Sequence, residues 1–164
     1  MPPDATPPEL PPIGVDRTLI FTRPETQKGY AYWQACCGTR EMPSRSDISP
    51  SGMREFLPHV GLLDWSEDNG QTEFHIRLAG TRVEQLIGAA TGKKLHEIAP
   101  PVVLKRWNMM YRLVCDEARP FRFTSRVTAL GKDWLASEFL VAPLSDDGKT
   151  VNMLFGVLVA WPVV

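Results

Sequence analysis

Residues 134–144 read WLASEFLVAPL and residues 153–161 read MLFGVLVAW. Both runs are apolar at odd and even positions alike, and the turn sequence SDDGK lies between them. An antiparallel strand that is apolar on both faces has to be covered on both faces. The two runs therefore predict strands that lie in the interior of a sheet, or beneath a helix or a partner chain.

Three further strands are indicated upstream of these runs. Residues 120–130 alternate in side-chain type, and GKD at 131–133 can turn the chain into the next strand. Residues 73–78 also alternate and predict a half-buried strand. Residues 60–65 form the other arm of a hairpin whose tight turn is EDNG at 67–70. The sequence thus predicts five strands.

The remaining segments predict helices. The first should run from near Thr22, where an acidic residue three positions on fits a capping box, to Gly38. Shorter helices are expected at 50–57 and 81–87, and a longer one follows Pro100. If the middle helices cover one face of the sheet, the first helix remains to cover the opposite face. The fold class is then α+β with a five-stranded antiparallel sheet.

The composition is that of a single globular domain. The chain has 164 residues, of which 43% are hydrophobic and 23% charged. Its net charge of −1 gives no field that would attract nucleic acid or an anionic membrane, and no apolar run is long enough to span a bilayer. We therefore expect a cytoplasmic protein. Residues 1–18 are rich in proline and predict a flexible leader before a single domain at 19–164.

Residue types that carry metal or hydrolytic chemistry do not form recognisable motifs. Three cysteines lack a CxxC spacing and three histidines lack an HxxxH spacing, so neither a metal site nor a disulfide framework is expected. Glu138 is the acidic residue that we nominate as pointing inward, and it supports the alternative of a small cone-shaped α+β enzyme. Arg122 and Arg126 share a strand face that we expect to be solvated.

Four strings in the chain resemble a known family: MPSRSDISP (42–50), FLPHVGLLDW (56–65), FHIRLAGTRVEQLIG (74–88) and TGKKLHEI (91–98). They look like the PAS-domain subfamily found largely as stand-alone bacterial chains. In that subfamily a P-x-R-x-D-hydrophobic-x-P segment precedes the sheet, and a strand ending in R-hydrophobic-x-G-T leads into a helix. The matching residues here include Pro43, Arg45, Asp47, Pro50, Arg77, Gly80 and Thr81. The resemblance covers residues 24–161.

This resemblance implies a PAS fold, with five antiparallel strands in the spatial order 2-1-5-4-3, helices on one face and the N-terminal helix on the other. That order places residues 153–161 at the centre. PAS domains are similar in sensing small ligands between helices and sheet, and in pairing through the outer sheet face and N-terminal helix. The reactive-cysteine motif of flavin-binding light sensors is missing, and only His96 lies near the expected pocket. We therefore expect neither haem nor flavin.

We predict a non-catalytic sensory or protein-interaction module in bacterial signal regulation. It would bind a small-molecule ligand, a regulatory protein partner or both, and form a homodimer. From the directions in which the predicted strands and helices should face, we nominate six pocket residues: Ile76, Trp107, Met110, Phe123, Phe139 and Phe155. The residues nominated for protein interaction are Tyr30, Trp33, Arg45 and Asp47. The alternatives are a dimerisation or scaffold domain with a filled core and no ligand, and the small enzyme named above.

Overall fold

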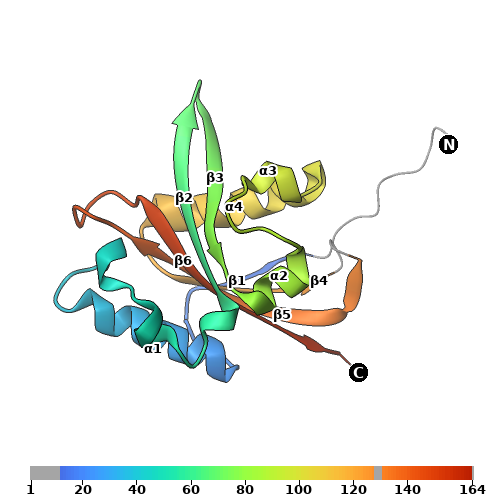
Figure 1. The fold of residues 1–164 in the computed structure, drawn as a ribbon, viewed down its shortest axis with the longest axis horizontal. Helices are drawn as coiled ribbons and strands as arrows, with labels where there is room; N and C mark the ends of the chain where they lie inside the picture. Colours follow the sequence, from blue (N-terminus) through green and yellow to red (C-terminus); the bar gives the residue numbers. More distant parts are fainter. Residues whose placement is uncertain (1–11, 128–130, 164) are drawn as a thin grey trace, which may run out of the picture.

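The two apolar runs form neighbouring inner strands, β5 (Lys132–Leu144) and β6 (Met153–Pro162), of one antiparallel sheet. In the computed structural model, which describes residues 12–127 and 131–163, the strand order is β1-β4-β5-β6-β2-β3 (Figure 1). β6 has β5 on one side and β2 (Val60–Asp68) on the other. The interior position predicted for residues 153–161 is therefore confirmed.

The sheet has six strands, so the expected count of five and the expected order are wrong at one edge. The additional strand is β1 (Gly14–Asp16), which pairs antiparallel with β4 (Phe121–Val127). The other five lie in the succession β4-β5-β6-β2-β3, with β3 spanning Gln71–Ala79.

The position of β1 corrects part of the expected leader. Residues 14–16 were expected in a flexible segment and instead form an edge strand, whereas residues 1–11 lie outside the described residues. Three residues are too few to show an alternation in sequence. A distant partner contributes to holding them, because a carboxylate oxygen of Asp16 lies 3.2 Å from a guanidinium nitrogen of Arg122.

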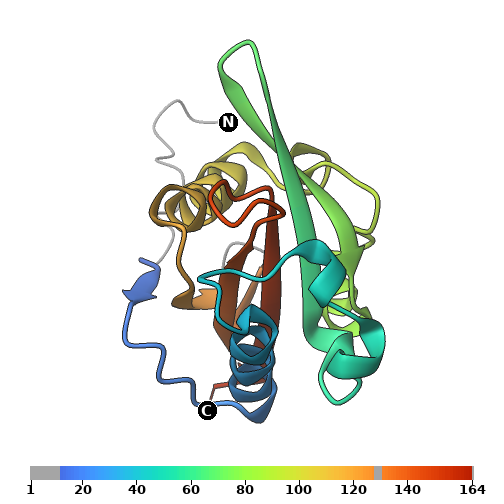
Figure 2. The ribbon, with the colours of Figure 1, turned by 90° about the vertical axis from the view of Figure 1, so that its left-hand side faces the viewer.

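Helices cover the sheet from two sides. α1 (Pro24–Cys37) lies beside β6 in Figure 2, and the other face carries α2 (Thr81–Ile87), α3 (Leu95–Ile98) and α4 (Pro101–Glu117). Neighbouring residues of β5 show the division. The Phe139 ring meets the Tyr111 ring of α4 at 6.2 Å, whereas Leu140 packs next to Gly29 of α1. The expected two-sided arrangement is present.

Two local expectations are wrong. α1 begins at Pro24, and no side chain caps it, because the Thr22 hydroxyl donates a hydrogen bond to Glu138 of β5 instead. Residues 50–57 do not form one short helix. They contribute to the 3-10 helices η2 (Pro50–Met53) and η3 (Leu57–His59), which follow η1 (Arg45–Asp47).

The turn of the β2–β3 hairpin follows its sequence signal. Asn69 and Gly70 have φ angles of 52° and 78°, the left-handed conformation that a two-residue hairpin turn requires and that glycine and asparagine adopt most readily. The tight turn predicted at 67–70 is thus confirmed. The hairpin projects past the helices (Figures 1 and 2).

Gly29 allows α1 to lie directly on the sheet. A Cβ atom at this position would come within 2.6 Å of Val157 Cγ2 on β6, closer than carbon atoms pack. Gly29 and Val157 are both buried. The valine is branched at Cβ and has little rotamer freedom, so it cannot swing aside cheaply. The missing side chain therefore sets the distance between helix and sheet.

We expect Gly29→Ala to lower the free energy of unfolding, although alanine favours a helix by about 1 kcal/mol over glycine. Overpacking against Val157 costs about 1–3 kcal/mol and outweighs that gain. In the Val157→Ala background the same substitution should become neutral or stabilising, as urea denaturation of the four variants would measure. Exposed Gln34→Ala in the same helix is the control. Equal effects of Gly29→Ala in both backgrounds would contradict this account.

Candidate functional site

A cavity of about 110 Å³ lies between the sheet and helices α2, α3 and α4. Side chains from five strands form its floor: Leu63, Ile76, Phe123, Phe139 and Leu158. The helices supply the other walls, chiefly through Val83, Leu86, Leu95, Trp107, Met110 and Tyr111. Its volume is of the order of that of cavities that hold one benzene-sized molecule, about 150 Å³. The lining is predominantly apolar, as in most small-molecule sites.

The structure brings five of the six nominated pocket residues together around this cavity: Ile76, Trp107, Met110, Phe123 and Phe139. Phe155 is the exception. Its ring lies 6.4 Å from the Tyr32 ring of α1, on the opposite face of the sheet. Because β6 is apolar at every position near Phe155, the sequence could not decide whether its odd-numbered or its even-numbered side chains face the cavity. The strand presents Leu158 instead, and sequence reasoning missed that residue and Tyr111.

Few polar groups line the cavity. The hydroxyls of Ser125 and Ser137 lie 3.1 Å apart, and Ser137 also donates to the Ser125 carbonyl oxygen. Arg106 and Arg126 contribute to the lining as well. In the described part of the chain, no cluster of histidine, cysteine and acidic side chains has the arrangement that holds a metal ion.

Glu138, nominated for the enzyme alternative, does not reach the cavity. It is fully buried on the α1 side of β5, between the cavity residues Ser137 and Phe139. Its carboxylate accepts hydrogen bonds from the backbone N–H groups of Thr22 and Arg23 at 3.0–3.2 Å. The Thr22 and Thr26 hydroxyls donate to it as well. The carboxylate therefore binds the start of α1. The alternative of a small cone-shaped enzyme is left without its nominated acidic residue at the cavity floor.

Arg122 completes this arrangement. Its Nε donates to Glu138 at 2.7 Å and its Nη1 to Asp16 at 3.2 Å. The expectation that this face of β4 is solvated is therefore wrong at Arg122, whose side chain is mostly buried. Burial alone raises the pKa of Glu138, but the hydrogen bonds from Thr26, Arg122 and Thr22 outweigh it and lower that pKa below its usual value. Glu138 is therefore a carboxylate at neutral pH.

The nominated interaction residues mostly serve the chain itself. Trp33 is only 5% exposed, and its indole N–H donates to the Pro143 carbonyl oxygen at 2.9 Å. Tyr30 is half-buried and stacks on Trp33. Arg45 is exposed and donates to the Ile48 carbonyl oxygen, while Asp47 accepts from the backbone N–H and hydroxyl of Ser44. The P-x-R-x-D segment is thus a self-bonded connection between α1 and the sheet.

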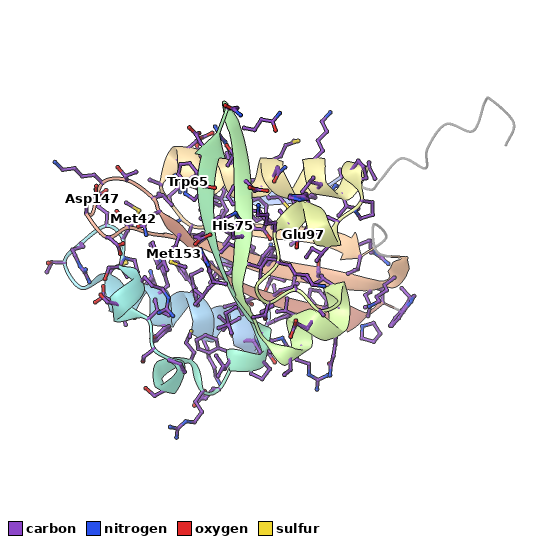
Figure 3. The ribbon with its side chains drawn as sticks, turned by 45° about the horizontal axis from the view of Figure 1, so that its top comes forward. Met42, Trp65, His75, Glu97, Asp147 and Met153 are labelled. Atoms are coloured by element: carbon purple, nitrogen blue, oxygen red, sulfur yellow. The ribbon has the colours of Figure 1, made fainter. Side chains whose placement is uncertain are left out.

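The histidines lie away from the cavity walls. His75 projects from β3 (Figure 3), and its Nδ1 lies 3.2 Å from an Asp64 oxygen on β2. His96, the haem-ligand candidate, pairs with Glu73 at 3.1 Å. Asp64 also pairs with Arg77, so acidic and basic side chains compensate one another on this face of the hairpin.

The sequence model of a family described as PAS domain matches residues 21–159, which include every residue of the cavity lining except Ile13 and do not include β1. No curated protein matches the chain. None of the helices in the described part of the chain has the length and apolar content that a membrane span requires.

We expect Glu138→Gln to lower the free energy of unfolding by roughly 3 kcal/mol at neutral pH, because it removes one partner of a buried ion pair. The folded-state pKa of Glu138 is lowered from 4.5. The difference in the free energy of unfolding between wild type and Glu138→Gln should thus be complete above pH 4.5. It should be lost as the pH falls through the folded-state pKa of Glu138.

Denaturant titrations of both proteins across this range measure the difference. The exposed Glu55, which pairs with Lys28, provides the matched control Glu55→Gln, for which we expect little change. A Glu138→Gln variant as stable as the wild type at neutral pH would show that the carboxylate does not hold α1.

Proposed function

The chain belongs to the PAS domain family, and from this premise we propose that it is a non-catalytic sensory module that binds a small apolar molecule in the cavity beneath α2, α3 and α4. The cavity itself is the observation that carries the proposal. The helices and the sheet leave a space of about 110 Å³ between apolar side chains. Such a space forgoes dispersion contacts that a ligand would restore.

The sheet offers a route from this cavity to the opposite surface. Phe139 of β5 lines the cavity, while its neighbours Glu138 and Leu140 contact α1. A ligand that favours one position of Phe139 would therefore bias the docking of α1. To move such an equilibrium from 1:99 to 99:1, the ligand must prefer one state by about 5.5 kcal/mol.

Toluene is a suitable probe, because it has the size and polarity of this space. At a hundredfold excess over its Kd, a ligand that binds only the folded state adds about 2.7 kcal/mol to stability. We expect toluene to raise the Tm of the wild-type protein and to shift the methyl NMR signals of Ile76 and Met110.

Val83→Phe should abolish both effects, because Val83 lines the cavity and a larger ring would fill it. Val102→Phe, at an exposed position of α4, should leave them intact. If toluene changes neither Tm nor methyl signals of the wild type, the scaffold alternative with a filled core is the better account.

We also propose that the module forms a homodimer or docks on a regulatory protein around the start of α1. Two large apolar side chains are exposed there or nearby: Ile20 is 70% exposed and Trp134 is 55% exposed. The Trp134 carbonyl oxygen accepts from Val163 N, and the adjoining Trp161 ring lies under the Arg23 guanidinium, 3.6 Å away. Exposed apolar groups of this size support a protein contact.

For the homodimer, we expect Trp134→Glu to convert a wild-type dimer to a monomer in sedimentation equilibrium, because a charge would enter the apolar contact. Met109→Glu, at an exposed position on α4, is the matched control and should leave the mass unchanged. A dimer that survives Trp134→Glu would contradict this placement. Bacterial origin and a place in the cytoplasm stay predictions from the sequence.

A further inference from the structure

Tyr111 is a polar residue of the cavity wall whose hydroxyl has no hydrogen-bond partner in the described part of the chain. The residue is 7% exposed and its side chain lines the cavity. Yet its hydroxyl forms no hydrogen bond within the described part of the chain. Burial raises the pKa of Tyr111, so the group stays protonated and is a donor at neutral pH. A hydroxyl without a partner in the protein keeps its capacity to donate to a bound molecule.

The serines and arginines of the lining differ from Tyr111 in this respect. Ser125 and Ser137 bond to each other across neighbouring strands. Arg106 and Arg126 take part in interactions of their own. Among the described cavity residues, the Tyr111 hydroxyl and the Trp107 indole N–H therefore keep hydrogen-bonding capacity for a ligand, and the hydroxyl belongs to the more deeply buried side chain.

Aromatic rings surround this hydroxyl-bearing side chain. The Tyr111 ring lies 5.3 Å from Phe74 and 6.2 Å from Phe139, and the planes of the latter pair are almost perpendicular. Phe123 and Trp107 also line the cavity. Aromatic side chains favour edge-to-face and offset contacts with another ring, and the volume of the cavity admits about one ring.

We infer that the cavity selects a single-ring aromatic ligand that carries a hydrogen-bond acceptor, and that Tyr111 recognises this ligand by donating its hydroxyl proton to the acceptor. The inference rests on the proposed sensory function and adds the chemical class of the ligand. The apolar walls hold the ring, and the hydroxyl distinguishes a ring with an acceptor from one without.

Toluene and benzonitrile form a matched pair of probes for this inference. They have nearly the same size and shape, but the nitrile nitrogen accepts a hydrogen bond and the methyl group does not. Isothermal titration measures both affinities. The infrared C≡N stretching band of bound benzonitrile reports the hydrogen bond directly, because it shifts when a donor binds the nitrogen.

We expect Tyr111→Phe to weaken benzonitrile binding about tenfold, the effect of one lost hydrogen bond in a buried site, and to change toluene binding less than twofold. The nitrile band should lose its hydrogen-bond shift in the same variant. Tyr30→Phe, a matched substitution on α1 outside the cavity, should change none of these quantities. Because the Tyr111 hydroxyl has no partner in the described chain, the variant should fold with unchanged or higher stability.

The outcomes separate this inference from the proposed function. If toluene binds but Tyr111→Phe alters neither the benzonitrile affinity nor its nitrile band, the role of Tyr111 is wrong and the sensory cavity stands. If neither probe binds the wild-type protein, the proposed function fails and the ligand class fails with it. The nitrile band in the wild-type complex decides the presence of the hydrogen bond even without the variant.

Discussion

A carboxylate without access to water holds the two layers of this protein together. Burying a charge costs several kcal/mol unless donors surround it, and Glu138 receives donors from three directions: backbone N–H groups at the start of α1, threonine hydroxyls, and the Arg122 guanidinium. A helix N-terminus also favours negative charge through its dipole. The strand thus binds Thr22 and Arg23, the two residues that lead into α1, and so fixes the start of the helix relative to β5.

This arrangement gives the two faces of β5 distinct tasks. Ser137 and Phe139 belong to the cavity, and Glu138 and Leu140 belong to the contact with α1. Because successive side chains of a strand leave opposite faces, a shift of one residue reaches both layers. A sensory module needs such a connection between its interior and its surface. The connection that we propose between cavity and α1 is the strand itself, without a separate relay segment.

The sequence predicted what depends on local period and on burial. Alternation located β3 and β4, two-sided apolarity identified β6 as an interior strand, and helix facing nominated Trp107 and Met110 for the cavity. It failed where a distant partner decides. Thr22 has the type and spacing of a cap but binds Glu138, 116 residues away in sequence. Phe155 was placed on the wrong face of the sheet, because β6 is apolar at odd and even positions alike. An alternation of apolar and polar residues, which would have shown the buried face, is missing there. The hydroxyl of Tyr111 also gives no signal in a helix pattern.

The short strand β1 has a consequence for how the sheet ends. Without it, β4 would be an outer strand with a row of unpaired N–H and C=O groups, the kind of margin at which chains join one another and aggregate. Gly14 and Asp16 occupy that margin, and Arg17 fastens the segment to Glu117 at the end of α4. The opposite edge strand, β3, is also partly paired, because the backbone of Gly92 and Lys93 forms hydrogen bonds with the backbone of Ile76. The chain therefore covers the middle of each outer strand with a short segment of its own, which leaves less edge backbone open to another chain.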